Sequence, residues 1–375
     1  MSLITTSVSQ QLDSIRGFSA FVVLLGHTNQ TLLLPTTNWG ASYIGLLTQL
    51  SVMIFFVLSG FLIGKSIISN KNKNGTFLID KYAEDRALRI YPPLIISTIL
   101  VWILFYVAPY FFPSGTIKFI EMPGVRFVRS SFSASMEQTI GSLFFINGFK
   151  ISTPSSNGPL WSLAFEIWYY IIAALIFSFK SNKFLTVLVL VLVVFVTKSN
   201  TLLYMLAPVW FSGLLIAVFH KKILRINSNL MLSVSLFFFA SSIFFAGRAI
   251  KLPADSFYLF DPWTQYKVIS GLWFGTILIL VLSGRIKLPT IFKSFSSFSY
   301  TLYIIHFPIM LFVFGCFQNY IIGNIRDSII VAILTVMTTI AISLFISKLS
   351  ENKKAIDSVL QSFTMLRLPK FMTRS

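Results

Sequence analysis

An arginine and a histidine stand eleven residues apart in an otherwise apolar stretch near the start of the chain. The stretch reads QLDSIRGFSAFVVLLGHTNQ and contains Arg16 and His27. In an α-helix, eleven residues advance three turns plus about 20°, so the two side chains share one face, about 16 Å apart along the axis. The imidazole can act as a general base near neutral pH, and the guanidinium can hold anionic oxygens. Alternatively, both polar groups extend to the nearest membrane interfaces.

A carboxylate and a second histidine add to this chemistry. Glu166, in LWSLAFEIWYY, lies roughly 10 Å inside the outer end of its predicted helix, which is broadly the depth of His27. We therefore expect Glu166 to pair with His27 and to assist it in catalysis, although a bond to backbone or tyrosine would also satisfy the carboxylate. His306, in SYTLYIIHFPIM, is expected to contact substrate together with Tyr303 and Trp161. Core hydrogen bonding and interface anchoring are the alternatives.

Two further motifs contain residues suited to an anionic or bulky ligand. RALR places Arg86 and Arg89 on one helical face, and arginine forks fit phosphate oxygens. FFVLSGFLIGKS ends another predicted helix, where Ser59 and Gly60 would leave room for a ligand. The competing interpretations are topology-determining charge for RALR and close helix packing for the second motif.

The composition indicates an integral membrane protein. Of the 375 residues, 55% are hydrophobic and only 11% are charged, whereas soluble domains contain about 25% charged residues. The formal charge of +18 is spread over small clusters, which does not indicate nucleic-acid binding. The single cysteine, Cys316, excludes an internal disulfide and a cysteine-based metal site, and we expect no metal.

Apolar runs near the ~20 residues that cross a bilayer predict an all-α fold, a polytopic membrane bundle of about ten transmembrane helices around a central polar cavity. The runs are 13–31, 44–65, 91–112, 159–179, 184–200, 202–219, 228–246, 265–284, 299–316 and 328–348. The fifth is the weakest because its uninterrupted apolar core is short, and the run at 140–149 suits an interfacial segment. We expect one transmembrane domain at 1–350 and a basic cytoplasmic tail at 351–375.

Lysine and arginine residues are distributed unequally between the two sets of loops. If the N-terminus lies in the cytoplasm, 20 of the 30 basic residues fall on the inner side and 9 on the outer side. The positive-inside rule therefore predicts cytoplasmic termini at both ends. The expected location is the inner (plasma) membrane of a cell.

Five motifs, taken in order, resemble those of the acyltransferase-3 family of membrane O-acyltransferases. They are LDSIRGFSAFVVLLGH, FFVLSGFLI, RALRIYP, LWSLAFEIWYY and SYTLYIIHFPI. The resemblance implies transfer of an acyl group, usually acetyl, from cytoplasmic acyl-CoA to a sugar hydroxyl in an extracytoplasmic or lipid-linked glycan, such as a surface polysaccharide. Family members often end the last helix with Glu, a basic residue and Pro. Here LSENKKA offers Glu351 without the proline, so we predict no role for Glu351.

The resemblance also orders the candidate residues into a route across the bundle. Acetyl-CoA would be bound by Arg16, Arg86, Arg89, Ser59 and Gly60. His27, assisted by Glu166, would act as general base on the acceptor hydroxyl or would carry the acyl group covalently, and the sequence does not decide between these. The competing functions are a glycan or lipid transporter or flippase without acyl transfer, and a sensor or scaffold without chemistry.

Overall fold

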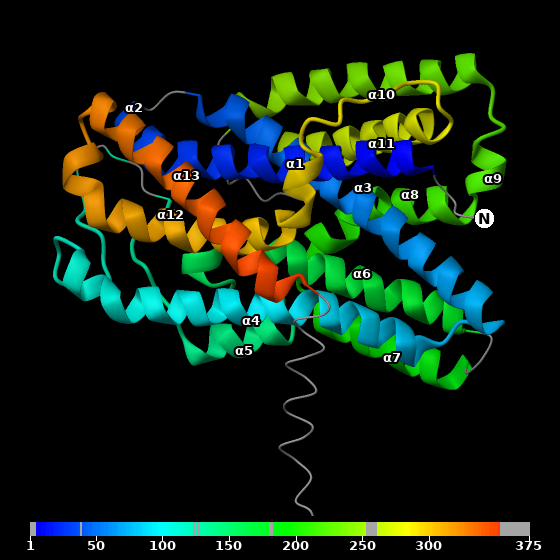
Figure 1. Cartoon of the computed structure of the whole chain (residues 1–375), viewed down its shortest axis with the longest axis horizontal. Helices are drawn as coiled ribbons and strands as arrows, with labels where there is room; N and C mark the ends of the chain where they lie inside the picture. The colour runs from blue at the N-terminus through cyan, green and yellow to red at the C-terminus, as the bar shows by residue number, and fades with distance from the viewer. Residues whose placement is uncertain are drawn as a thin grey trace, which may run out of the picture.

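The fold is a bundle of long helices, most of which run along one common direction (Figure 1). The structure, a computed structural model, describes residues 5–37, 40–122, 125, 128–179, 183–252 and 261–352. Most of the predicted tail, residues 353–375, lies outside the described residues, and so do Met1 to Ile4. The all-helical fold class predicted from the sequence is confirmed for the part of the chain that the structure describes.

The helices follow one another with mostly short connections. The first half contains α1 (Thr6–Thr28), η1 (Asn29–Leu33), α2 (Leu34–Thr37), α3 (Ala41–Asn74), α4 (Ile79–Phe111), α5 (Met136–Leu143), η2 (Ser155–Asn157) and α6 (Leu160–Ser178). The second half contains α7 (Lys183–Thr197), α8 (Thr201–Val218), α9 (His220–Ile223), α10 (Ser228–Ala249), α11 (Pro262–Leu282), η3 (Lys293–Ser297), α12 (Ser299–Ile321) and α13 (Ile325–Ser350). The η1 segment is a π-helical continuation of α1, whereas η2 and η3 are 3₁₀ turns.

Within the described ranges, nine helical segments are long and apolar enough to cross a membrane. They correspond to nine of the ten predicted runs, so the chain is a multi-pass membrane protein. The remaining run forms α7, which has 15 residues and is shorter than the ~20 residues of a full span. The predicted interfacial segment forms the end of the short helix α5 and the loop after it.

Although α7 is short, it returns the chain to the side of the bundle on which α6 begins. Just after α7, Ser199 and Asn200 donate hydrogen bonds to the carbonyls of Phe149 (2.7 Å) and Gly148 (2.8 Å). These carbonyls belong to the loop that leads into α6. The helices α6 and α8 therefore start on the same side and run in the same direction.

The first and last described helices share one side of the bundle. At the end of α13, Ser350 and Glu351 form hydrogen bonds with Thr301 in the first turn of α12. Arg16 of α1 is close enough to interact electrostatically with Glu351. The N-terminal half of α1 and the end of α13 therefore lie near each other, in agreement with an even number of membrane passes.

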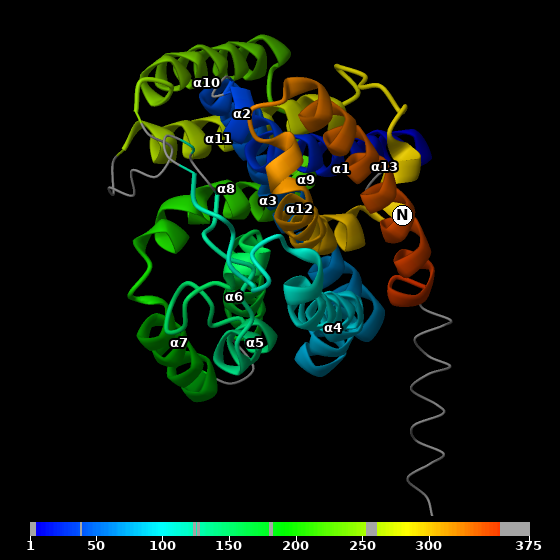
Figure 2. The same cartoon turned by 90° about the vertical axis from the view of Figure 1, so that its left-hand side faces the viewer.

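The helix α3 lies at the centre of one half of the bundle, in contact with α1, α8 and α11, and Figure 2 shows these four helices grouped together. Its approach to α8 depends on two glycines. A Cβ atom on Gly60 would lie 2.0 Å from the carbonyl oxygen of Trp210, and one on Gly213 would lie 2.0 Å from that of Val57. Small residues of this kind allow helix backbones to pack closely in membranes. Gly60, predicted to bind the donor, thus faces α8.

Replacing Gly60 by alanine is expected to destabilise the protein by about 1–3 kcal/mol, the usual cost of inserting a group into a packed interface. Gly247 of α10 is the matched control, because no atom lies within 4 Å of a Cβ built there and alanine favours a helix over glycine. Thermal unfolding in detergent would measure both variants. Equal melting temperatures for Gly60→Ala, Gly247→Ala and the unchanged protein would contradict the described α3–α8 packing.

The outer helices present apolar side chains to lipid. Only 17% of the most apolar window of α10 and 22% of that of α13 are buried inside the protein. Phe237 and Phe244 on α10 are 66% and 61% exposed. In a bilayer such side chains contact lipid tails, which accounts for part of the high phenylalanine content.

The helix α12 is fixed in place by a proline within it. Pro308 has no backbone N–H, so the carbonyl of Ile304, four residues earlier, lacks its helical donor. Ser97 of α4 and Asn157 of η2 donate hydrogen bonds to this carbonyl, at 2.8 Å and 2.9 Å. The proline thereby ties α12, which bears Tyr303 and His306, to two neighbouring elements.

Candidate active site

A cavity of about 100 Å³, lined by both polar and apolar side chains, lies among α1, α3, α4, α6 and α12. Its polar lining comes from side chains far apart in the sequence, namely Arg16, Ser59, Arg86, Arg89, Ser162, Glu166, Tyr170, Ser299, Tyr300 and Tyr303. All three arginines predicted to bind the donor therefore share one cavity with the predicted carboxylate. The predicted residues Gly60, Trp161, His27 and His306 do not line it.

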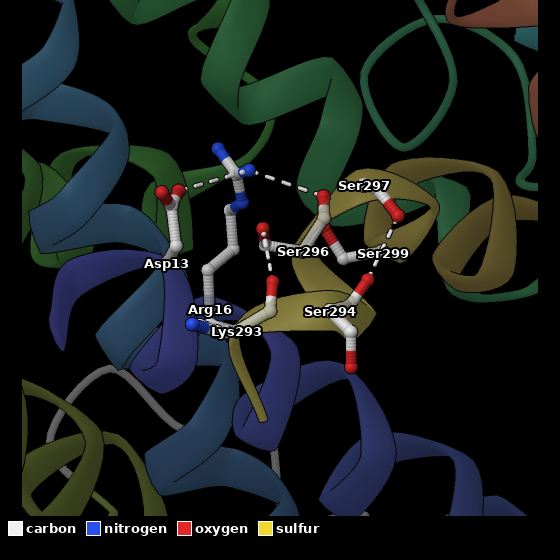
Figure 3. Close-up of polar contacts among 7 residues, drawn as sticks. All are labelled: Asp13, Arg16, Lys293, Ser294, Ser296, Ser297 and Ser299. Carbon is white, nitrogen blue, oxygen red and sulfur yellow. Dashed lines mark hydrogen bonds and ion pairs between the residues drawn. The ribbon is translucent and has the colours of Figure 1, made fainter. Parts of the chain in front are cut away.

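Arg16 is held at the cavity wall by a serine-rich turn (Figure 3). Its Nη2 donates to the carbonyl of Ser296 at 3.1 Å and lies 3.3 Å from Oδ1 of Asp13. The turn is closed by serine hydroxyls, since Ser296 Oγ donates to the carbonyl of Lys293 and Ser299 Oγ donates to that of Ser296. The Nε of Arg16 is buried and has no hydrogen-bond acceptor within the described residues.

The segment that leads into this turn is also attached to α1. The backbone N–H groups of Leu288 and Phe292 donate to Gln11 Oε1 (2.8 Å) and Ser14 Oγ (3.2 Å). A Cβ atom on Gly17 would lie 2.3 Å from the carbonyl oxygen of Phe292, so only glycine permits this approach. These contacts hold the part of α1 that contains Arg16, and they therefore determine the position of its guanidinium group.

Arg86 and Arg89 meet the cavity from the first part of α4, as their spacing on one helical face predicts. Both guanidinium groups interact electrostatically with Glu166, and Arg89 also repels Arg16. The Nε of Arg86 is buried without an acceptor in the described part of the chain. A buried guanidinium N–H that lacks a partner is unfavourable, and an anionic group entering the cavity would satisfy it.

Glu166 is bonded to hydroxyl groups in the cavity. Ser59 Oγ donates to its Oε1 at 2.5 Å, and the hydroxyl of Tyr170 donates to the same oxygen. Trp210 Nε1 donates to Ser59 in turn, at 3.2 Å. The predicted pair between Glu166 and His27 is not formed, because similar depth does not place two side chains on facing sides of their helices. The carboxylate is instead bonded to tyrosine, as the alternative interpretation stated, and also to serine.

Replacing Tyr170 by phenylalanine is expected to destabilise the protein by about 1–3 kcal/mol, because a buried carboxylate loses one of its two donors. Tyr91→Phe is the matched control, since its hydroxyl donates to the carbonyl of Leu143 at an exposed site and its loss should cost less. Unfolding midpoints in detergent compare the two. A Tyr170→Phe midpoint equal to that of Tyr91→Phe would contradict this arrangement of Glu166.

His27 lies beside the second histidine, outside the cavity. Its Nδ1 is 3.0 Å from Oε1 of Gln30, and since an amide oxygen only accepts, Nδ1 carries the proton and Nε2 presents a lone pair. The ring centroids of His27 and His306 are 5.2 Å apart, and Phe307 contacts His27 edge-on at 5.2 Å. Arg129 is near enough to interact electrostatically with His27.

Tyr303 connects the cavity to the histidines. It lines the cavity, its hydroxyl shares a 2.6 Å hydrogen bond with Ser162, and its ring centroid lies 5.9 Å from that of His306. Tyr303, which lines the cavity with the arginines, contacts His306, and His306 contacts His27. The side chains of Tyr303 and His306 fill the space between the cavity and His27.

The comparison with known proteins identifies the family. A family model described as an acyltransferase domain matches residues 9–348. The chain belongs to the acyltransferase-3 family. No curated protein and no solved structure matches it. The protein is therefore a membrane acyltransferase, as the five motifs predicted, and family membership favours acyl transfer over the transporter and scaffold alternatives.

Glu351 has a structural role in this acyltransferase that we did not predict. Its Oε1 accepts hydrogen bonds from the backbone N–H (3.0 Å) and the hydroxyl (2.6 Å) of Thr301, so it caps the first turn of α12 from another helix. Burial raises the pKa of Glu351, while the Thr301 bonds and the charges of Arg89 and Arg16 oppose the rise. A glutamate directly after the last apolar run was the available signal, and the missing proline led us to set it aside.

Two other predicted residues lie behind the cavity wall of the acyltransferase. Trp161 packs against the rings of Phe56 and Phe165, at centroid distances of 6.3 Å and 5.2 Å, and Gly60 packs against α8. Among the described residues, no group of three or more His, Cys, Asp or Glu side chains could hold a metal ion.

Proposed function

We propose that the protein transfers an acetyl group from cytoplasmic acetyl-CoA to a hydroxyl of a sugar in an extracytoplasmic or lipid-linked glycan, from a site in the inner membrane. The observation that carries the proposal is the cavity with three arginines, two of which have a buried Nε without an acceptor. Family membership supports acyl transfer in general. What we propose beyond the family is that the acyl group is acetyl, that the donor is the coenzyme A thioester and that the acceptor is a glycan.

The three arginines suit the phosphate groups of the donor. Guanidinium forks bind phosphate oxygens in pairs of charge-assisted hydrogen bonds, and Arg16 and Arg89 repel each other until an anion lies between them. The cavity is on the side of the bundle that receives the two ends of the chain, where the lysine and arginine count predicts the cytoplasm. A cytoplasmic anionic donor therefore fits this side.

The pantetheine arm would extend from the arginines towards His27. The ~16 Å between Arg16 and His27 along α1 is comparable with such an extended arm. Tyr303 and His306 fill part of the route, so the arm requires the Tyr303 side chain to turn aside from Ser162. Ser59 and Glu166 line the cavity that the arm would cross.

His27 would act as the general base. Gln30 holds Nδ1 in its protonated form, which leaves the Nε2 lone pair to take the proton of the acceptor hydroxyl. The hydroxyl oxygen forms a bond to the thioester carbonyl carbon, the bond from that carbon to sulfur breaks, and the imidazolium returns the proton to the thiolate. If His27 instead carries the acetyl group covalently, an acetylated protein will accumulate when acceptor is absent.

Inverted membrane vesicles test the proposal. Labelled acetyl-CoA supplied to the exposed cytoplasmic face should label glycan in vesicles that contain the protein, and sealed right-side-out vesicles should show no labelling. Vesicles from cells without the protein are the control. Equal glycan labelling with and without the protein would refute the proposed function.

A further inference from the structure

His306 is the most completely buried ionisable side chain near the proposed reaction centre. It is 1% exposed, and its Nδ1 lies 3.1 Å from the carbonyl oxygen of Leu302. A carbonyl oxygen only accepts, so Nδ1 carries the proton in the neutral ring and Nε2 presents a lone pair. This Nε2 is buried and has no hydrogen-bond partner in the described part of the chain.

The neighbours of His306 explain why no protein group serves its Nε2. The hydroxyl of the adjacent Tyr303 is used by Ser162, and Phe307 offers only an apolar ring. His27 presents a lone pair of its own, because Gln30 holds its proton on the other nitrogen. The two imidazoles, with rings 5.2 Å apart and tilted by 34°, thus each present an acceptor nitrogen, and that of His306 is buried without a donor among the described residues.

We propose that His306 Nε2 accepts a hydrogen bond from a second hydroxyl of the acceptor, next to the hydroxyl that His27 deprotonates. The acceptor is then a sugar with two neighbouring free hydroxyls, one for each of the two adjacent rings. This inference rests on the proposed function and narrows its substrate class. A glycan hydroxyl satisfies the buried nitrogen, and an acceptor that lacks it leaves the nitrogen unpaired, which is unfavourable.

The two hydroxyls have different fates. The first loses its proton to His27 Nε2, its oxygen takes the acetyl group from the thioester, and the proton passes to the departing thiolate. The second hydroxyl keeps its proton and only donates a hydrogen bond to His306. His306 therefore helps to select and position the acceptor, and its own charge does not change. Partly exposed His27 marks the side from which the sugar reaches the pair.

Two substitutions of His306 separate this role from a purely structural one. His306→Asn retains an N–H close to the position of Nδ1, which can donate to the Leu302 carbonyl, but has no acceptor at the position of Nε2. His306→Gln places an amide oxygen near Nε2 and gives up the bond to Leu302. Incorporation of labelled acetyl from acetyl-CoA into the native glycan of inverted vesicles would be measured at equal protein levels.

We expect His306→Gln to retain at least about a tenth of the activity and His306→Asn to lose about 100-fold or more, as sites built around a substrate hydroxyl do when the pairing fails. Activity of the asparagine variant equal to or above that of the glutamine variant would overturn the inference. If the unchanged protein labels no glycan, the proposed function itself has failed, which is a distinguishable result.

The position of the acetyl group on the glycan provides a second, independent readout. Nuclear magnetic resonance of surface glycan from cells with the protein, compared with cells without it, would locate the added acetyl group. The inference predicts acetylation of a ring hydroxyl that has a free hydroxyl on the neighbouring carbon. Acetylation of a hydroxyl without such a neighbour, for example a primary exocyclic one, would contradict it.

Discussion

Replacing His27 by alanine is expected to reduce acetyl transfer by about 10²–10⁴-fold, the usual contribution of a positioned general base. The ring is oriented by Gln30 and stands beside His306, whose own Nε2 we propose to hold a second hydroxyl, so His306 does not replace the lost base. The assay is acetyl transfer to glycan in inverted vesicles, with protein level measured by immunoblotting. Binding of coenzyme A should change little, because the arginine cavity does not include His27.

The control for His27 is Lys71→Ala, an exposed residue near the end of α3 whose substitution should leave transfer unchanged. A wild-type rate of acetyl transfer in His27→Ala would contradict the assignment of His27 as the general base. A protein-bound acetyl group that forms without acceptor in the unchanged protein, and not in His27→Gln, would favour the covalent route. Survival of that acetyl-protein in His27→Gln would exclude it.

Replacing Arg86 by alanine is expected to weaken coenzyme A binding by about 10- to 100-fold, since hydrogen bonds to charged groups contribute about 1.5–3 kcal/mol and 1.4 kcal/mol corresponds to tenfold. Its buried Nε has no acceptor among the described residues, so the substitution should cost little stability. Calorimetric titration of purified protein with coenzyme A would measure the effect. Arg86→Lys should restore only part of the affinity, because lysine supplies charge without the planar fork.

Arg89→Ala and Arg16→Ala extend the same measurement around the cavity. Arg89 should behave like Arg86. Arg16 is also bonded to Ser296 and Asp13, so its loss should lower stability as well as affinity. Unchanged affinity for coenzyme A in Arg86→Ala would indicate that the RALR motif acts in membrane topology alone. Lys71→Ala, which changes a basic residue outside the cavity, is again the control.

The parts of the fold that the sequence could predict are those set by local pattern. Apolar runs located nine spans, and the three-residue spacing of Arg86 and Arg89 placed both in one cavity. The fifth run became the short α7 because length, and not hydrophobicity, limits a span. The order of the motifs was sufficient to identify the family.

The errors at the site arose where a contact depends on helix rotation and not on depth. Glu166 and His27 were predicted to pair because of their similar depth, but the carboxylate bonds to Tyr170 and Ser59 and the imidazole stands beside His306. Depth follows from counting residues, whereas the facing direction follows from packing that one sequence does not reveal. Glu351 was missed for a related reason, since its partner Thr301 is fifty residues away.

Affinity labelling with bromoacetyl-CoA tests most directly whether the arginine cavity leads a coenzyme thioester to the imidazole pair. This electrophilic analogue carries its reactive carbon next to the position of the thioester carbonyl, and mass spectrometry of the digested protein would locate the alkylated residue. The account predicts alkylation of His27, prevented by excess coenzyme A and strongly reduced in Arg86→Ala. Alkylation confined to loop lysines or Cys316, at a rate unaffected by coenzyme A, would contradict it.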